Sequence, residues 1–497
     1  LPWLCLGDFN EVLRPEEHEG VGQRSNAQIQ AFRDTIDVYM LLDLGYTGRF
    51  WTFKKKVTGG TYTRCRLDRA LVSTDWMARF PLAAVTHEIA ASSDHSALLV
   101  DMGRMKKQHK KPEFHYEVMW ETHEGLHDAL VDGWDAAEPC LTVEDMRNKL
   151  RNLAAGLSRW SNDTFGNVKK EIKHLKKQLD QLRGDPLRTG PSHVELKINE
   201  RLIEMYHREE LMWRQRARIQ WLSAGGKNTR FFHLRASSRR KKNMIKALQN
   251  SLGAIVVDPD ELKAMANSFY QTLYSSEGVE NMEAVLDHVP RKVTEEMNAR
   301  LNAEYTSDEV KAALFQMFPT KAPGPDGFPA HFYQRNWDIC GEDVTRIVLR
   351  IVRGEESLEC INDTVLVLIP KVTSPSQLSQ FRPISLCNVL YKIASKVVAN
   401  RLKIILPGII SEQQSAFVPG RLITDNIICA YECLHFMKRT RSRSNSFCAL
   451  KLDMMKAYDR LEWPYLKGIM GKLGFSQQWI DIVMGMVSSV SFSVLFN

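Results

Sequence analysis

A run of nine residues near the C-terminal end combines two carboxylates and an aromatic ring in a spacing suited to nucleotide chemistry. It reads KLDMMKAYD over residues 451–459. A strand is predicted over 447–452, so Asp453 comes directly after the end of that strand. An acid at the end of a buried strand can hold Mg²⁺, which prefers carboxylate and phosphate oxygens. Two such ions about 3.5–4 Å apart can activate a 3′-hydroxyl and stabilise a leaving pyrophosphate. Asp453 is therefore a candidate metal ligand, and Tyr458 could pack beneath the sugar of an incoming nucleotide.

The same run has a simpler structural interpretation. Asp453 can cap the N-terminus of a helix that follows the strand. Asp459 can be a solvated acid on that helix. The local pattern leaves both interpretations open, so the rest of the sequence must decide between them.

The middle of the chain is strongly basic. Residues 205–245 contain 11 Lys and Arg against two acids, a local charge of +9 in a chain whose net charge is +8. Cations that alternate with aromatic rings can neutralise phosphates and stack unpaired bases, which favours RNA as a partner. The alternative is a solvated basic helix whose Trp and Phe pack inward. The candidate contacts are Arg214, Arg216, Arg218, Arg239, Arg240, Lys241 and Lys242.

Composition narrows the class of protein. The chain has 497 residues, of which 44% are hydrophobic, and this suggests about three globular units. The nine cysteines are scattered without a C-x-x-C pair, which argues for a reducing compartment and against a zinc site. The sequence has no run of 18 apolar residues, so it predicts no membrane-spanning helix.

The expected elements change in type along the chain. Residues 1–103 predict mixed strands and helices, with Leu4, Leu6 and Phe9 in a short buried run and further strands over 66–72 and 97–100. Residues 104–300 predict mainly helix. Ile172, Leu175, Leu179 and Leu182 form one apolar stripe, and a second helix over about 194–222 completes an antiparallel hairpin.

The last two hundred residues predict alternating helices and strands. Thr306 and Glu309 have the spacing of a capping box, and residues 320–329 form a loop rich in Pro and Gly. A buried strand is expected over 365–370. A helix is expected over 388–406, ended by Pro407, with Ile393, Val397 and Leu402 facing inward.

Five motifs in this order resemble the reverse transcriptase of LINE-type (non-LTR) retrotransposons, most closely those of plants. They are KAPGPDG at 321–327, LIPK at 368–371, FRPISL at 381–386, QSAFVPGR at 414–421 and the run at 451–459. The resemblance covers residues 300–497, and the motifs are specific as an ordered set although no single one is.

The resemblance implies a role for each matched position. Lys371 and Arg382 would contact the incoming triphosphate, Tyr458 would exclude a 2′-hydroxyl, and Asp453 would hold Mg²⁺, with Mn²⁺ as an alternative ion. The positions implied to lie near template and primer are Gly324, Asp326, Gln414, Phe417, Gly420 and Arg421. A surface ion pair remains the alternative for Arg382, a plain turn for residues 324–327 and a core position for Phe417.

The resemblance also predicts an acidic element that these residues lack. The family carries an aromatic-Ala-Asp-Asp hairpin downstream, and no Asp-Asp pair occurs in the 497 residues. Both ends of the chain lie in strand-like runs, so the chain is expected to be a fragment that does not polymerise by itself.

Three further motifs resemble the second half of an apurinic-like endonuclease, which precedes the polymerase in these elements. They are GDFN at 7–10, RLDRAL at 66–71 and SSDH at 92–95. His95 beside Asp94 would engage a scissile phosphate, Asp8 would orient water, Asn10 would hold a phosphate oxygen and Asp68 would support the site. The family's early metal-binding Glu and Asn are missing, so nicking of DNA by this chain is not expected.

Together these observations predict an α+β multidomain chain. Residues 1–103 would form part of an endonuclease/exonuclease/phosphatase α/β sandwich, residues 104–300 a helical basic linker that resembles those of plant elements, and residues 301–497 the fingers and partial palm of a reverse transcriptase. The implied partners are an RNA template, a DNA primer or target and dNTPs, in nucleus and cytoplasm, with no membrane. The alternative is a non-catalytic relic that binds nucleic acid through the basic linker.

Overall fold

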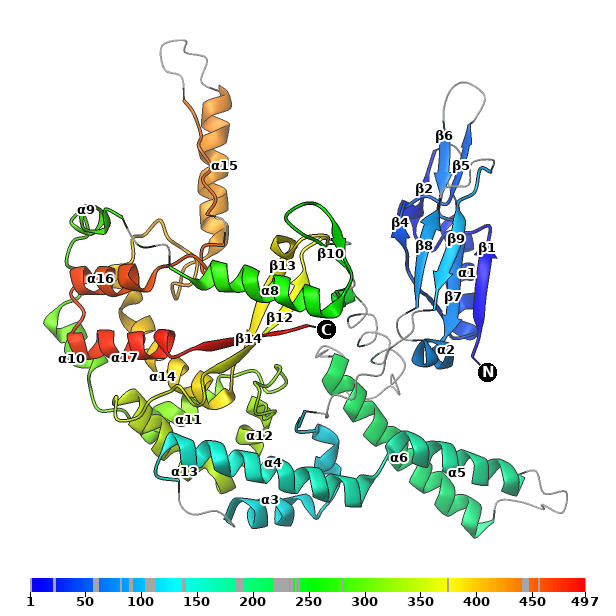
Figure 1. Cartoon of the computed structure of the whole chain (residues 1–497), viewed down its shortest axis with the longest axis horizontal. Coiled ribbons are helices and arrows are strands. Elements are labelled where there is room, and N and C mark those ends of the chain that lie inside the picture. The colour runs from blue at the N-terminus through cyan, green and yellow to red at the C-terminus, as the bar shows by residue number, and fades with distance from the viewer. Residues whose placement is uncertain are drawn as a thin grey trace. The chain divides into compact units, whose positions relative to one another are not determined.

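The chain divides into two compact units (Figure 1). Unit 1 contains residues 1–112, 226–244 and 372–374, and unit 2 contains residues 113–225, 245–371 and 375–497. The computed structural model describes residues 2–496 except 21–23, 57–61, 81–82, 89–92, 103–112, 136–139, 184–191, 218–231, 233–235, 237–238, 240–241, 246, 277, 279, 373–374, 440–446 and 455.

Unit 1 is built from three small sheets. Their strand orders are β1-β7-β3, β2-β6-β5 and β4-β8-β9. The strands are β1 (Leu4–Asp8), β2 (His18–Glu19), β3 (Leu41–Asp43), β4 (Thr47–Gly48), β5 (Phe53–Lys56), β6 (Tyr62–Cys65), β7 (Asp68–Ser73), β8 (Ala84–Glu88) and β9 (Ala97–Asp101). Strands β7 and β9 confirm the two strands predicted over 66–72 and 97–100.

The core of unit 1 lies on β7 and β8. Val72 and Val85 on these strands and Trp76 on α2 (Thr74–Arg79) are almost fully buried. Within residues 2–101, as far as the structure describes them, the helices are η1 (Pro15–Glu17), α1 (Asn26–Val38) and α2. The prediction of a buried run at the start of the chain was wrong, because Leu4 and Leu6 are 36% and 50% exposed. Strand β1 pairs with β7 alone among the described strands, and no described element covers the face that carries these two leucines.

The first half of unit 2 is helical. Its elements are η2 (Val118–Thr122), α3 (Leu126–Asp135), α4 (Val143–Phe165), α5 (Val168–Arg183) and α6 (His193–Ala217). Helices α5 and α6 lie side by side (Figure 1), and Arg183 near the end of α5 pairs with Glu195 near the start of α6. This confirms the predicted antiparallel hairpin. The expected continuation of the second helix to 222 lies outside the described residues.

The second half of unit 2 mixes helices with short strands. Strands β12 (Asp363–Pro370), β13 (Phe381–Leu386) and β14 (Ser491–Leu495) form a sheet of order β13-β12-β14, and β10 (Leu248–Gln249) pairs with β11 (Ile255–Val256). The helices are α8 (Pro259–Tyr274), α9 (Met282–Leu286), α10 (Glu295–Leu301), α11 (Ser307–Phe315), α12 (Ala330–Arg335), α13 (Trp337–Val352), η3 (Leu378–Gln380), α14 (Val389–Ile409), α15 (Ile423–Arg439), α16 (Trp463–Leu473) and α17 (Gln477–Ser488).

One hydrophobic core joins both halves of unit 2. It contains Trp134 and Leu150 from the helices of the linker together with Val344, Ile347 and Leu390 from α13 and α14. The core therefore continues across position 300, because the apolar faces of α3 and α4 pack against α13.

Most of the elements predicted for residues 301–497 form. Thr306 and Glu309 make the expected capping box at the start of α11, and β12 matches the strand predicted over 365–370. Pro407 was expected to end its helix but lies inside α14, which ends at Ile409. The N–H of Ile410 still donates to the carbonyl of Leu406, so the last turn stays closed around the proline.

The strand predicted over 447–452 was wrong. The described residues 447–454 contain neither helix nor strand, and the side chains of Leu450, Leu452 and Asp453 are exposed. An isolated strand leaves its backbone N–H and C=O groups unpaired. No described strand pairs with this segment, so the apolar pattern alone does not make it a strand.

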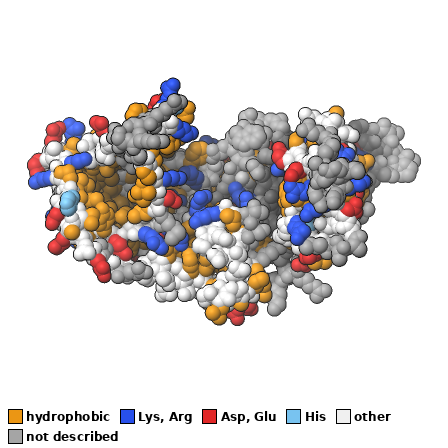
Figure 2. All heavy atoms as spheres, turned by 90° about the horizontal axis from the view of Figure 1, so that it is seen from above, with side chains coloured by type: hydrophobic (Ala, Val, Ile, Leu, Met, Phe, Trp, Pro, Cys, Tyr) orange, Lys and Arg blue, Asp and Glu red, His pale blue; other side chains and the backbone are white. Residues whose placement is uncertain are grey.

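Helix α15 has no buried residue. Ile427 and Tyr431 are 63% and 66% exposed. Figure 2 shows one face of the molecule, on which hydrophobic side chains gather. Among the described residues, no helix is both long enough and apolar enough to span a membrane.

Candidate functional site

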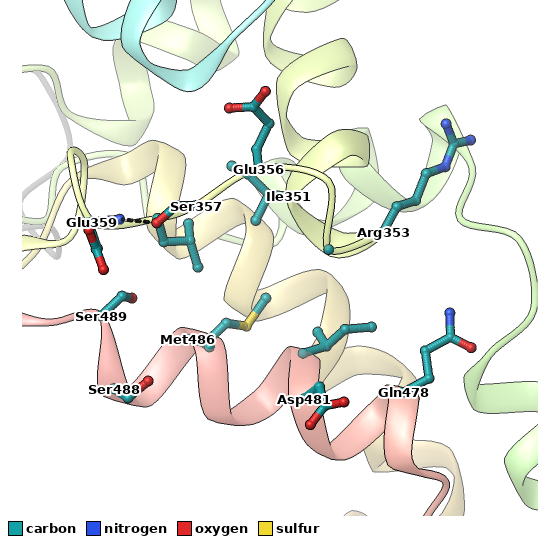
Figure 3. Close-up of a pocket in the computed structure, with 14 residues that line it drawn as sticks. Ile351, Arg353, Glu356, Ser357, Glu359, Gln478, Asp481, Met486, Ser488 and Ser489 are labelled. Atoms are coloured by element: carbon teal, nitrogen blue, oxygen red, sulfur yellow. Dashed lines mark hydrogen bonds between the residues drawn. The ribbon is translucent and has the colours of Figure 1, made fainter.

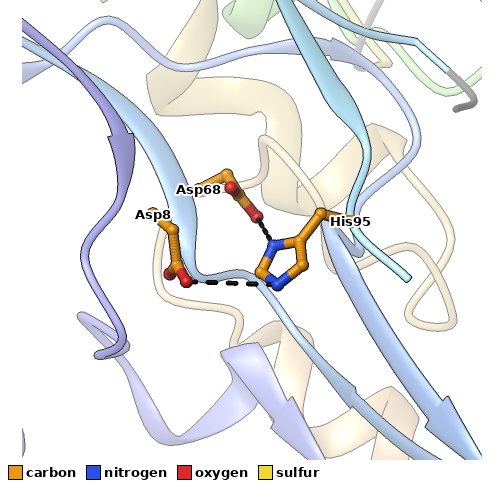
Figure 4. A group of neighbouring side chains, drawn as sticks. All are labelled: Asp8, Asp68 and His95. Atoms are coloured by element: carbon orange, nitrogen blue, oxygen red, sulfur yellow. Dashed lines mark hydrogen bonds and ion pairs between the residues drawn. The ribbon is translucent and has the colours of Figure 1, made fainter. Parts of the chain in front are cut away.

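Three predicted residues of unit 1 come together around the start of β7 (Figure 4). Asp8 at the end of β1 is directly opposite Asp68 in the antiparallel pairing of β1 with β7. The Nδ1 atom of His95 lies 2.9 Å from Oδ2 of Asp68, and its Nε2 atom lies 4.0 Å from Oδ2 of Asp8. The imidazole thus connects two carboxylates that are sixty residues apart in the sequence.

Backbone hydrogen bonds hold this group in place. The hydroxyl of Thr52 accepts hydrogen bonds from the N–H groups of Leu67 and Asp68, both at 2.9 Å. The N–H of Ser96 in turn donates to the carbonyl of Thr52 at 2.7 Å. Thr52 therefore fixes the start of β7 and the segment of His95 at once, a role that the sequence analysis missed because nothing in the pattern around Thr52 marks it.

The other two predicted residues of this group are placed differently. The N–H of Asn10 donates to Oδ1 of Asp8 at 2.8 Å, and Asn10 has a positive φ of 53°, so it forms a tight turn that orients the Asp8 carboxylate. The backbone carbonyl of Asp94 accepts a hydrogen bond from the N–H of Lys54 at 2.9 Å. Asp94 itself is exposed.

The electrostatics of the group favour a charged imidazole. Burial by itself lowers the pKa of His95, but the hydrogen bond to Asp68 and the negative charges of Asp68, Asp8 and Asp94 outweigh it, so the pKa is raised. The ligand atoms of Asp8, Asp68 and His95 all lie within 4.8 Å of one another. With a neutral imidazole they could hold a divalent cation, and with a protonated one they could engage a phosphate.

A buried ionic network lies in the same segment. Arg69 is fully buried and donates to Glu17 and Asp43, and Arg66 pairs with the same two acids. Burial raises the pKa of Glu17 and of Asp43, but the two guanidinium groups lower both pKa values below their ordinary range. This network fixes β7 from the interior and was not predicted.

In unit 2 the structure puts Lys371 and Arg382 on one face of a hairpin. Arg382 is opposite Ile369 in the pairing of β12 with β13, and Lys371 is two residues beyond Ile369, on the same face. Both residues are exposed. The ammonium group of Lys371 donates to the carbonyl of Ser379 at 3.1 Å, which holds it near the hairpin.

A third cation, missed in the sequence, lies near this hairpin. Burial lowers the pKa of Lys456, the charge of Asp459 opposes this, and the charges of Lys371 and Arg460 lower it further. Its Nζ atom lies 4.3 Å from the ring centroid of Phe269. Lys456 also has a positive φ of 54°, which no sequence pattern marks.

Asp453 and Tyr458 are both exposed. Tyr458 is 78% exposed, and its ring lies 6.1 Å from that of Phe417, which has a positive φ of 65°. In the part of the chain that the structure describes, Asp453 belongs to no group of three possible metal ligands.

The loop at 324–327 is held tightly. A Cβ on Gly324 would clash with Oδ1 of Asn388, and one on Gly327 would clash with the carbonyl oxygen of Phe114. Asp326 accepts from the N–H of Phe328 at 3.1 Å. Burial raises the pKa of Asp326 to about 7, so near neutral pH this carboxyl is only partly charged.

The motif at 414–421 caps a helix. The guanidinium of Arg421 donates to the carbonyls of Pro407 and Ile410 at 3.1 Å and to that of Gln414 at 2.6 Å. These carbonyls belong to the end of α14 and the turn after it, so Arg421 supports the backbone there. Gly420 has a φ of +80° with open space around it.

The basic stretch is only partly described. Arg214 and Arg216 lie in the last turn of α6, and Arg216 pairs with Glu117 at 2.6 Å. Arg239 and Lys242 are exposed, while Arg218, Arg240 and Lys241 lie outside the described residues.

A pocket of about 630 Å³ lies elsewhere, between the end of α13 and α17 (Figure 3). Glu356, Glu359 and Asp481 are among the residues that line it. None of the predicted site residues lines this pocket.

Comparisons with known proteins match the polymerase part of this picture. Residues 369–495 match the family described as reverse transcriptase (RNA-dependent DNA polymerase). The chain is 28% identical over 509 residues to the "Transposon TX1 uncharacterized 149 kDa protein" of Xenopus laevis, an alignment that covers 99% of this chain and 38% of that protein. The chain thus spans less than half the length of this relative. The two matches support a reverse transcriptase of the kind carried by non-LTR retrotransposons.

Proposed function

We propose that residues 301–497 act as the fingers and part of the palm of an RNA-directed DNA polymerase of a non-LTR retrotransposon. The family role is to copy element RNA onto a DNA 3′-end at a nicked target. The observation that carries the proposal is that the matched segment 369–495 contains Lys371, Arg382, Asp453 and Tyr458. Lys371 and Arg382 share one face of the β12–β13 hairpin, where a guanidinium fork and an ammonium charge suit a triphosphate.

The metal site of this polymerase is incomplete in the described part of the chain. Reverse transcriptases generally use divalent ions, typically Mg²⁺, and holding two ions takes more than one carboxylate. Asp453 is exposed, belongs to no described ligand group, and no Asp-Asp pair occurs in the 497 residues. We therefore propose that this chain by itself binds a nucleotide without extending a primer.

Photocrosslinking of a reactive dNTP to the full chain in the presence of Mg²⁺ tests the nucleotide site. The label is expected on peptides of the β12–β13 hairpin, and the Lys371→Ala and Arg382→Ala variants should reduce it about tenfold or more, since each removes a charge-assisted contact. Lys403→Ala, which removes an exposed lysine of α14, is the matched control. Equal labelling of all four proteins would overturn the assignment, and a primer-extension product from the unmodified chain would overturn its inactivity.

Residues 1–103 are proposed to be the C-terminal part of an endonuclease/exonuclease/phosphatase domain. The geometry of Asp8, Asp68 and His95 supports this, because two carboxylates and an imidazole converge on one point. A plasmid-nicking assay with Mg²⁺ tests the activity of this domain, and the full chain is expected not to nick the plasmid. Binding of a divalent ion is a separate expectation with its own measurement. Nicking that disappears in His95→Ala would show a competent nuclease instead.

The alternative function is a binding protein without catalysis that acts through residues 205–245. It predicts RNA binding that Arg239→Gln and Lys242→Gln weaken, together with no hairpin-specific crosslink. The two functions are therefore separated by the nucleotide crosslink, which only the polymerase role requires.

A further inference from the structure

Helix α5 carries five lysines on one side. They are Lys169, Lys170, Lys173, Lys176 and Lys177. At about 100° per residue these positions fall within an arc of roughly 120°, which we call the lysine face. The other side of the helix carries Val168, Ile172, Leu175 and Leu179, which are buried in the core of unit 2. The apolar side therefore accounts for the packing of α5, and the lysine face is not needed for it.

Two lysines at the margin of this face are held by aromatic rings of α6. The Nζ atom of Lys169 lies 4.9 Å from the ring centroid of Trp213, and that of Lys176 lies 5.4 Å from the ring centroid of Tyr206. The two lysines are seven residues apart on α5, and the two rings are seven residues apart on α6. The same kind of contact therefore occurs twice along the hairpin. Cation–π contacts hold both ammonium groups in place without an acid.

The other three lysines are exposed, and no described acid lies within ion-pair distance of their ammonium groups. Lys170, Lys173 and Lys177 form no ion pair with any residue that the structure describes. Lys173 lies three or four positions from each of the other four lysines, and each such like-charge pair destabilises a helix. Asp180 falls within the same arc, three residues after Lys177, so the lysine face carries five lysines and one acid. An arrangement that costs stability in the free protein is relieved when an anion covers it.

We propose that the lysine face of α5 binds the phosphate backbone of a nucleic acid. A strand carries phosphates every few ångströms, so one strand can engage several of these lysines at once. Lysine offers a point charge and reads no base, so the contact is independent of sequence. The rings of Trp213 and Tyr206 already carry lysine cations, so stacking of bases is not part of this contact. The surface lies beside Arg214 and so extends the predicted basic stretch at the end of α6.

The proposal rests on the proposed function in one respect: a polymerase chain must hold its nucleic acid outside the site of Asp453. The test measures binding of the full chain to three labelled nucleic acids: oligouridylate, the matching DNA strand and a DNA duplex. Fluorescence anisotropy reports the binding at salt concentrations between about 50 and 200 mM. The variant combines Lys170→Gln, Lys173→Gln and Lys177→Gln. The control combines Lys263→Gln, Arg291→Gln and Arg300→Gln, which removes the same charge from cations that are already paired with acids elsewhere in unit 2.

The lysine variant is expected to bind about tenfold more weakly at the lower salt. It should lose about 3 from the slope of log affinity against log salt for the duplex and about 2 for the single strands. The control should keep the slope of the parent. Replacing the same three residues by arginine should restore it, because the contact needs only charge. All three nucleic acids should bind more weakly to the variant. A loss confined to one of them would show that the lysines recognise more than the phosphate backbone and would contradict the proposal.

Protection from lysine acetylation, read by mass spectrometry on the unmodified chain, provides a test without substitutions. Lys170, Lys173 and Lys177 should be protected by the oligouridylate and Lys263 should not. Equal slopes for the two triple variants together with no protection would overturn the proposal. The nucleotide crosslink at the β12–β13 hairpin should be the same in the lysine variant and the parent, so failure of the lysine face and failure of the nucleotide site are distinguishable.

Discussion

The ammonium group of Lys149 lies 2.9 Å from a carboxylate oxygen of Asp343 and joins α4 to α13 across 194 positions of the chain. Trp134 donates to the same carboxylate at 3.1 Å and Arg346 at 2.7 Å. Burial raises the pKa of Asp343, but these cations outweigh burial and the pKa is lowered. One carboxylate therefore fixes three segments of unit 2.

Lys149→Met should destabilise unit 2 by about 3 kcal/mol, because it leaves a buried carboxylate without its main counter-charge. The midpoint of urea unfolding, followed by circular dichroism, measures this. Lys311→Met, on the exposed side of α11, is the control and should change little. Combining Lys149→Met with Asp343→Leu should recover much of the loss, and a double variant no more stable than the single one would contradict this account.

The pKa of His95 should be raised above about 6.5, its ordinary value. Because the folded pKa exceeds the unfolded one, the stabilisation is fully present below the unfolded pKa and is lost as pH rises through the folded pKa. An NMR titration of the imidazole measures the shift. Asp68→Asn should lower this pKa strongly, and Asp94→Asn, which removes the most weakly acting acid, should lower it less. Equal effects would mean that the hydrogen bond to Asp68 does not dominate the other acids.

Mn²⁺ should broaden the NMR signals of the His95 imidazole if Asp8, Asp68 and His95 hold a divalent ion. The ion requires a neutral imidazole, so broadening should weaken as pH falls below the pKa of His95. EDTA should reverse it. Asp8→Asn should weaken the broadening, whereas Asp101→Asn, in the same unit but outside the group, should not. Broadening that survives Asp8→Asn would place the ion elsewhere.

Gly327→Ala should cost several kcal/mol, because Gly327 has a φ of +78° and its new Cβ would clash with the carbonyl oxygen of Phe114. Gly420→Ala is a matched control, with a φ of +80° and nothing within 4 Å. It should cost only about 1 kcal/mol from the backbone conformation. Urea unfolding compares the two, and equal losses would show that the close approach to Phe114 is not decisive.

Stability should depend on the ionisation of Asp326. Its folded pKa of about 7 lies above its ordinary value of 3.8, so the folded state holds a proton that the unfolded state has released. Stability therefore falls as pH rises from about 4 to 7. Asp326→Asn should flatten this dependence in urea titrations at several pH values. A slope that is unchanged in the variant would assign it to another group.

Local patterns predicted the elements whose signals are local. The capping box of Thr306 and Glu309, the strand at 365–370 and the hairpin of α5 and α6 each depend on spacing within a few turns, and each is present. The strand predicted over 447–452 was wrong because a strand forms only when another strand pairs with it. Which strand can pair with it is not a local property of the sequence. Leu4 and Leu6 failed for a related reason, since an apolar residue is buried only if another element covers it.

The candidate sites divide in the same way. Asp8, Asp68 and His95 were singled out by the resemblance of their motifs to an endonuclease, and the structure brings the three side chains together. Thr52 and Lys456 were missed. Thr52 matters through hydrogen bonds to residues distant in the sequence, and Lys456 has a positive φ. Residue spacing shows neither property. Arg421 was expected near template and primer, and its guanidinium also holds the end of α14, a contact set by distant backbone carbonyls.

The shared core of unit 2 bears on how such chains can recombine during evolution. An exchange between two relatives with its crossover near residue 300 would combine α3 and α4 from one parent with α13 and α14 from the other, and the two halves of the core would no longer be complementary. Selection should therefore keep the linker helices and the polymerase half together as one inherited block. The phylogeny of residues 113–217 should follow that of residues 301–497.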